Sequence, residues 1–274
     1  MPANKQKALF CLDFETLGVR IGIGSNERSL LRAVERHLPE ILPLEIDFSA
    51  DGPAGHFFEI LWDGADGKIR VLKDKEQLFT LKSEERLIEY LSSRIRITVA
   101  EFAGSRVFLH AGVVGWKGKA IVIPGKSRSG KTLLVAELIR QGAVYYSDEY
   151  AVLDKEGFVH PFPKKLSVRG IINDFEQKDI EPEFFGARVG TGAIPAGLFL
   201  ITSFEKGAVW NPTAPSAGQA MLEILQHTIP VRRRPEFVLK VLKKCITRAI
   251  IAESVRDEAK DTVPFIFELL RNGL

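Results

Sequence analysis

The chain has 274 residues, of which 45% are hydrophobic and 27% are charged, and its formal net charge is +3 at pH 7. This length suits one large domain or two unequal ones with an ordinary globular core. The small net charge argues against nucleic acid as a partner. No run approaches 18 apolar residues, so we expect no membrane span and no membrane partner.

Two further features of the composition concern location. The N-terminal stretch turns acidic before a long apolar region develops, which is not the pattern of a signal peptide. The two cysteines, Cys11 and Cys245, lie far apart and lack metal-ligand spacing. We therefore expect a reduced, cytoplasmic protein.

Residues 1–104 predict an N-terminal α+β lobe. Its elements are strands at 8–13 and 18–23, a helix capped by Asn26 that runs to His37, a hairpin of 57–62 with 68–72, and a helix over 84–103. His37 and His56 are isolated, and nothing else in this segment predicts chemistry, so the role of the lobe stays open.

The second domain, residues 105–274, contains the most informative motif of the chain. Residues Gly125 to Thr132 read GKSRSGKT and match the phosphate-loop pattern G-x-x-x-x-G-K-[ST] at every fixed position. A strand is predicted before the loop, at 119–123, and a helix after it, at 133–141, with Gly142 at its end. The alternative is a Gly/Ser-rich turn that matches by chance, but the strand and helix on either side favour a nucleotide site.

The loop predicts ATP and Mg²⁺ as ligands. In such a loop the backbone N–H groups and the following helix N-terminus face the phosphates. Lys131 would reach the β- and γ-phosphates and Thr132 would hold Mg²⁺, while Arg128 contacts either phosphate or a neighbouring subunit. The predicted nucleotide-binding residues are Gly125, Lys126, Ser127, Arg128, Ser129, Gly130, Lys131 and Thr132.

Two adjacent acids, Asp148 and Glu149, follow the predicted loop helix. A phosphotransfer site needs a carboxylate near the metal and the nucleophile, so both acids are candidate metal ligands and Asp148 is the candidate base. Neighbouring side chains of a strand point to opposite faces, so the two should differ in role unless the backbone bulges. The alternative is a solvated acidic turn between two strands.

The stretch from Phe108 to Leu153, FLHAGVVGWKGKAIVIPGKSRSGKTLLVAELIRQGAVYYSDEYAVL, resembles the catalytic core of the HPr kinase/phosphorylase family, in particular its HPr kinase-related members. In that family a histidine precedes the phosphate loop and an acidic pair follows the loop helix, as His110 and Asp148-Glu149 do here. A later stretch, LSVRG at 166–170, resembles the family's Glu-x-Arg-Gly signature, with Arg169 at the arginine and Ser167 at the glutamate.

The resemblance implies an α/β, phosphoenolpyruvate carboxykinase-like P-loop fold with a central mixed sheet. It also implies Mg-ATP-dependent phosphorylation of a serine hydroxyl and a homo-oligomer. It places His110 near the phosphates, where a switch from neutral to charged near pH 6.5 would be useful; the alternative is a structural histidine. Arg169 either neutralises charge on the γ-phosphoryl group or lies on the surface.

The acceptor is open: a protein, a peptide or a small molecule. The main alternative is a nucleotide-binding regulatory or scaffold protein without turnover. A GTPase is disfavoured because no Asn-Lys-x-Asp string occurs. Further elements are a strand at 197–204 and helices at 217–227 and 235–248, and the Arg232–Arg234 run is either solvated or binds an acidic substrate.

Overall fold

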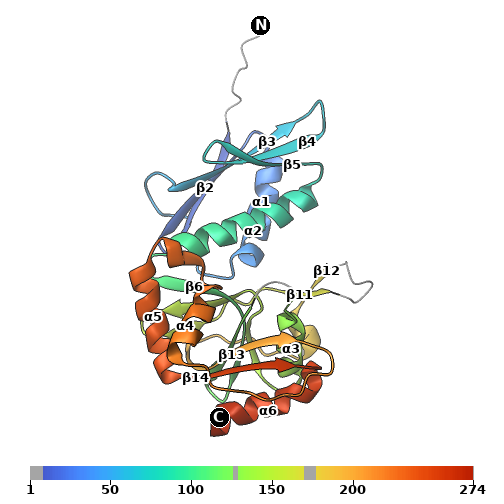
Figure 1. The fold of residues 1–274 in the computed structure, drawn as a ribbon. Coiled ribbons are helices and arrows are strands. Elements are labelled where there is room, and N and C mark those ends of the chain that lie inside the picture. The colour runs from blue at the N-terminus through green and yellow to red at the C-terminus, as the bar shows by residue number, and fades with distance from the viewer. Residues whose placement is uncertain (1–8, 126–128, 170–176, 274) are drawn as a thin grey trace. The chain divides into compact units, whose positions relative to one another are not determined.

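The computed structural model describes residues 9–125, 129–169 and 177–273, with the side chains of Arg169 and Gln177 outside that description. The chain divides into two compact units, Met1–Gly104 and Ser105–Leu274 (Figure 1). Each unit combines a mixed sheet with helices, so the predicted α/β class is confirmed. Among the described residues, no helix is long and apolar enough to cross a membrane.

The N-terminal unit is a five-stranded sheet in the order β1-β2-β3-β4-β5 with two helices that pack on each other. Strands β2 and β3 are parallel and the other neighbours are antiparallel. The elements are β1 Phe10–Thr16, β2 Val19–Ser25, α1 Arg28–Ile41, β3 His56–Asp63, β4 Lys68–Lys73, β5 Glu76–Leu81 and α2 Glu84–Phe102.

The predicted cap and end of helix α1 are wrong. Glu27 is the cap, and its carboxylate accepts from the Ser29 N–H at 3.1 Å. Asn26 instead bonds the backbone of Trp62 on β3, at 2.7 and 3.0 Å. The helix continues to Ile41 through Pro39, and its last turn buries Leu38 and Ile41.

The C-terminal unit is built on a seven-stranded mixed sheet in the order β10-β9-β6-β7-β13-β14, with β8 also paired to β6. A separate ribbon pairs β11 with β12. The strands are β6 Arg106–Trp116, β7 Lys119–Pro124, β8 Val144–Ser147, β9 Tyr150–Asp154, β10 Phe158–His160, β11 Leu166–Arg169, β12 Gln177–Ile180, β13 Ile194–Phe204 and β14 Ile250–Arg256. The helices are α3 Lys131–Arg140, α4 Ala217–Leu225, α5 Pro235–Arg248 and α6 Ala259–Asn272, with short 3₁₀ turns at Pro182–Phe185 and Ile229–Arg232.

Period-two alternation along the central strands divides this unit into two cores. On β7, Ile121 and Ile123 pack with α3 and α6, whereas Ala120 and Val122 pack with α4 and α5. The sheet therefore lies between two helical layers, the arrangement expected when both faces of parallel strands are covered. Strands β7, β13 and β14 run parallel, so their carboxyl ends meet at one edge, where the phosphate loop follows β7.

Candidate active site

The described ends of the predicted phosphate loop lie between β7 and α3, in the context that the sequence predicts. Gly130 precedes the helix with φ +80°, a left-handed conformation that suits glycine. A Cβ on Gly125 would come within 2.8 Å of the Ser129 hydroxyl oxygen, so a larger residue there would force the Ser129 side chain to shift. Residues Lys126, Ser127 and Arg128 lie outside the described part of the chain.

Two predicted site residues converge on the carbonyl oxygen of Gly125. Lys131 donates to it from Nζ at 2.7 Å, and its side chain is buried. His110 Nδ1 lies 2.7 Å from the same oxygen. Burial, followed by the nearby Lys131, lowers the pKa of His110 below its ordinary value. His110 is therefore neutral near pH 7, and the contact to a carbonyl assigns its proton to Nδ1.

Asp148 faces the first turn of α3. The Thr132 hydroxyl donates to Asp148 Oδ2 at 2.8 Å. The other oxygen, Oδ1, is buried and has no hydrogen-bond partner among the described residues. Burial raises the pKa of the Asp148 carboxyl to about 6, although the Thr132 hydrogen bond and the nearby Lys131 and Lys164 oppose the increase. At pH 7 the carboxylate is mainly ionised yet close to its pKa, as suits a general base.

The two acids occupy the bend between β8 and β9, so the strand-alternation argument does not apply to them. Ser147 Oγ accepts from the backbone N–H groups of Glu149 and Tyr150, at 3.1 and 2.9 Å, and shapes this bend. While Asp148 faces α3, Glu149 pairs with Lys164, with Oε2 and Nζ 3.3 Å apart. The acids therefore have different neighbours.

His110 lies within the 11-residue strand β6. Strand β6 continues past it to pair with β7 and β8, because its small residues fit beneath α3. At Gly112, for example, a Cβ would lie 2.6 Å from Val135 of α3. The side chain of Arg169 is outside the described atoms, and its role stays a prediction.

Sequence reasoning missed Arg256, which ends β14 at the same sheet edge. Its side chain is 2% exposed. Nη2 donates to the Gly130 carbonyl at 2.9 Å and Nη1 donates to the Asp257 carbonyl at 2.9 Å. Arg256 thereby ties β14 to the residue that begins α3. Strand β14 was not predicted. Because β14 pairs parallel with β13, predicting it would have placed Arg256 at the sheet edge where the phosphate loop lies.

The residues present fit Mg²⁺ bound together with a nucleotide. Thr132 Oγ1 and the Asp148 carboxylate are oxygen ligands of the kind Mg²⁺ prefers, and the buried Ser129 Oγ also lacks a hydrogen-bond partner in the described ranges. The described residues contain no group of three or more His, Cys, Asp or Glu that could hold a metal ion. Such a site suits Mg²⁺, which takes further ligands from phosphates and water.

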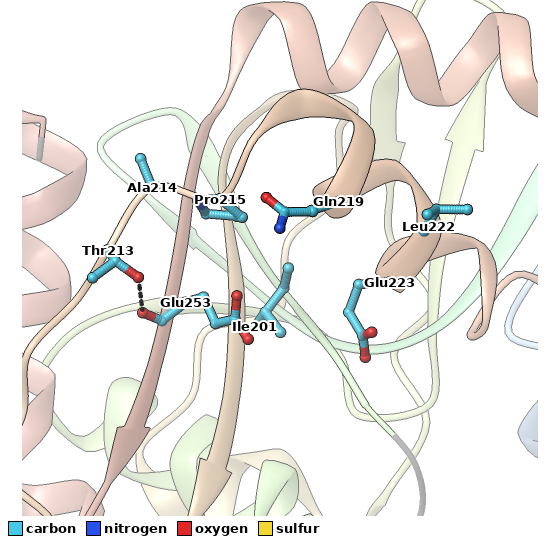
Figure 2. Close-up of a pocket in the computed structure, with 8 residues that line it drawn as sticks. All are labelled: Ile201, Thr213, Ala214, Pro215, Gln219, Leu222, Glu223 and Glu253. Atoms are coloured by element: carbon cyan, nitrogen blue, oxygen red, sulfur yellow. Dashed lines mark hydrogen bonds between the residues drawn. The ribbon is translucent and has the colours of Figure 1, made fainter.

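A surface cavity of about 510 Å³ lies on the α4 side of the sheet. Figure 2 shows the residues that line it: Ile201, Thr213, Ala214, Pro215, Gln219, Leu222, Glu223 and Glu253. Glu223 accepts from Gln226 at 2.9 Å, and Gln219 completes the capping box of α4 with Ser216. These polar groups stabilise α4, whereas the phosphate loop leads into α3 in the other helical layer.

Comparisons with known proteins include a distant structural likeness. No family model matches the chain, and no curated protein matches it. A solved structure, the Hpr(Ser) kinase/phosphatase from Coxiella burnetii, is similar over 60% of this chain and 88% of that chain, with 15% sequence identity and a TM-score of 0.30. The proposal that follows rests on the geometry of the site.

Proposed function

We propose that the Ser105–Leu274 unit is a Mg-ATP-dependent kinase that phosphorylates a serine hydroxyl of a protein, peptide or small molecule. The observation that carries the proposal is the buried Asp148 carboxylate, hydrogen-bonded to Thr132 where α3 begins. A phosphate loop with such a carboxylate combines phosphate binding with a base. The resemblance of residues 105–173 to the HPr kinase family adds support, and the carboxykinase-like P-loop assignment belongs to the proposal.

The chain's residues have distinct roles in this mechanism. The Ser129–Thr132 amides and Lys131 bind the phosphates, and Thr132 with Asp148 would hold Mg²⁺. Bound Mg²⁺ supplies charge neutralisation at the β- and γ-phosphates. Asp148 orients the acceptor hydroxyl and takes its proton through Oδ1, and neutral His110 keeps the Gly125 carbonyl in place. Positioning and electrostatics account for most of the catalysis, since phosphoryl transfer needs little covalent help.

The substitution Asp148→Asn tests the assigned base. Asparagine keeps the size of the side chain and an acceptor for Thr132 but cannot take a proton at neutral pH. We expect phosphate transfer to fall by about 100-fold or more, with MgATP still bound in calorimetry. Asp154→Asn, the same change in the β9 strand, is the control. Normal transfer by Asp148→Asn would refute the role given to Asp148.

An alternative is a nucleotide-binding regulatory or scaffold protein without turnover. The observation in its favour is Ser167, which stands where the signature that the sequence resembles has a glutamate. Calorimetry with MgATP, combined with a phosphate-release assay over a panel of serine-containing acceptors, separates the two. Binding without acceptor-dependent turnover would favour the alternative. The cytoplasmic location, the homo-oligomer and the absence of nucleic-acid and membrane partners stay predictions.

A further inference from the structure

Lys164 lies in the segment between β10 and β11 and is directed at the acidic bend. Its side chain is 18% exposed, and Nζ lies 3.3 Å from Glu149 Oε2 and 3.4 Å from Ser167 Oγ. An ammonium group has three N–H donors. Among the described residues, Lys164 Nζ has no hydrogen-bond partner besides Ser167 Oγ, so the ammonium group has a donor left for a ligand.

The backbone at Lys164 is fixed to strand β8, which leads directly into the acidic bend. The Tyr145 side chain, on β8, is fully buried, and its hydroxyl donates to the Lys164 carbonyl at 2.5 Å. The Lys164 N–H donates to the Phe162 carbonyl at 2.9 Å. The position of Lys164 is therefore set by a contact to β8 and, through its side chain, by the ion pair with Glu149 next to the proposed base.

Asp148 thus lies within the field of two lysines that come from different elements. Lys131 belongs to the first turn of α3, and Lys164 precedes β11; both favour the charged form of Asp148. Lys131 is engaged on the loop carbonyl of Gly125. Charge on a phosphoryl group in transfer is spread over three oxygens, so a second cation on the acceptor side of Asp148 would help to neutralise it.

We propose that Lys164 is a second catalytic lysine of this site, and that its ammonium group contacts the phosphoryl group as it passes to the acceptor. The inference rests on the phosphotransferase function proposed above. In the step, the acceptor oxygen forms a bond to the γ-phosphorus and the bond to the β,γ-bridging oxygen breaks, with its electron pair leaving on ADP. The hydroxyl proton goes to Asp148. Lys164 keeps its protons throughout, and Glu149 acts as a positioning residue for it.

The next residue provides a matched control. Lys165 pairs with Glu181 at 3.0 Å, but the two side chains are 34% and 60% exposed. Both lysines therefore have a glutamate partner, and in the described part of the chain only Lys164 also approaches Ser167 and the acidic bend. A change at Lys165 removes a similar ion pair without removing a cation from beside Asp148.

Calorimetry of the full chain with MgADP, alone and with aluminium fluoride as a mimic of the phosphoryl group in transfer, tests the inference without a known acceptor. We expect wild type and Lys165→Met to bind tighter when fluoride is present. Lys164→Met should keep its MgADP affinity but bind the fluoride complex about 10- to 100-fold more weakly than wild type. Lys164→Arg, which keeps the charge, should recover part of the loss.

The outcomes are distinguishable. Equal fluoride-complex affinities for Lys164→Met and Lys165→Met would overturn the inference and leave the proposed function intact. A wild type that fails to bind MgADP, or gains nothing from fluoride, would contradict the proposed function itself. Melting curves check the folding of each variant, and Lys164→Gln replaces Lys164→Met if the methionine variant is unfolded.

Discussion

At the scale of single residues, Asp148 couples the chemistry of the site to stability. Its pKa is about 6 in the folded chain against 3.8 for the ordinary group, so between these values the folded chain binds the proton more tightly than the unfolded chain. Stability therefore falls as pH rises through this window, and above it the buried charge costs about 2–3 kcal/mol. Asp148→Asn should accordingly be more stable than wild type at pH 7.5 and nearly equal to it at pH 4.

Urea denaturation of both proteins at the two pH values measures this difference. Asp154 supplies a control of opposite sign, because hydrogen bonds from His160 and from two backbone N–H groups lower its pKa despite its burial. Asp154→Asn should therefore lose stability at pH 7.5. If Asp148→Asn is destabilised equally at both pH values, ionisation of the buried Asp148 carboxyl does not lower the free energy of unfolding, and the expected pH dependence is refuted.

Lys164 and Arg256 show why single-residue roles are hard to predict from sequence. Lys164 stands beside a second lysine, Lys165, and reads as a solvated residue, and its neighbours Glu149 and Tyr145 are 15 or more positions away. Arg256 reaches Gly130 over 126 positions. Such contacts depend on strand pairing, which local spacing does not encode. The strand and helix on either side of the predicted loop, and the approach of Asp148 to Thr132, were predictable because motif and order along the chain suffice.

At the scale of elements, Arg256 joins β14 to the start of α3. Its Nη2 donates to the Gly130 carbonyl, directly before the residues proposed to hold phosphate and metal. Arg256→Met removes this charged donor and leaves the carbonyl without it. We expect a loss of about 1–3 kcal/mol in the free energy of unfolding, together with weaker MgATP binding because the first turn of α3 is less well held.

Denaturation and calorimetry on the same preparation measure both effects. Arg248→Met, at the exposed end of α5, is the control, since its guanidinium bonds only the Glu156 carbonyl among the described residues, at 3.3 Å. Loss of stability with unchanged nucleotide affinity would mean that Arg256 supports the fold but not the loop.

Elements whose sequence carries the usual turn or helix residues were predictable. The missed elements contain residues that normally argue against the structure they form. The Leu17-Gly18 turn contains glycine, the usual residue of such turns, whereas the Asp74-Lys75 turn before β5 has two non-glycine residues at φ 50° and 72°. Helix α6 contains Pro264, which argues against a helix. The Lys260 carbonyl, which would have paired with the missing N–H, accepts instead from Gln141 Nε2 at 3.4 Å.

At the scale of the whole molecule, every residue proposed for chemistry belongs to the C-terminal unit. That unit has its own seven-stranded sheet and two cores, one with α3 and α6 and the other with α4 and α5. We therefore expect residues 105–274, expressed alone, to fold and to bind MgATP with the affinity of the full chain. Circular dichroism and calorimetry check this. A folded fragment that does not bind nucleotide would assign part of the site to residues 1–104.

The central claim is that the phosphate loop and Asp148 act on one nucleotide. A crystal structure of the chain with Mg²⁺ and a non-hydrolysable ATP analogue tests it most directly. We predict phosphates at the N-terminus of α3 on Lys131, Mg²⁺ on Thr132, and the terminal phosphoryl group beside Asp148 Oδ1. An analogue bound elsewhere, or an Asp148 carboxylate turned away from the terminal phosphoryl group, would contradict it.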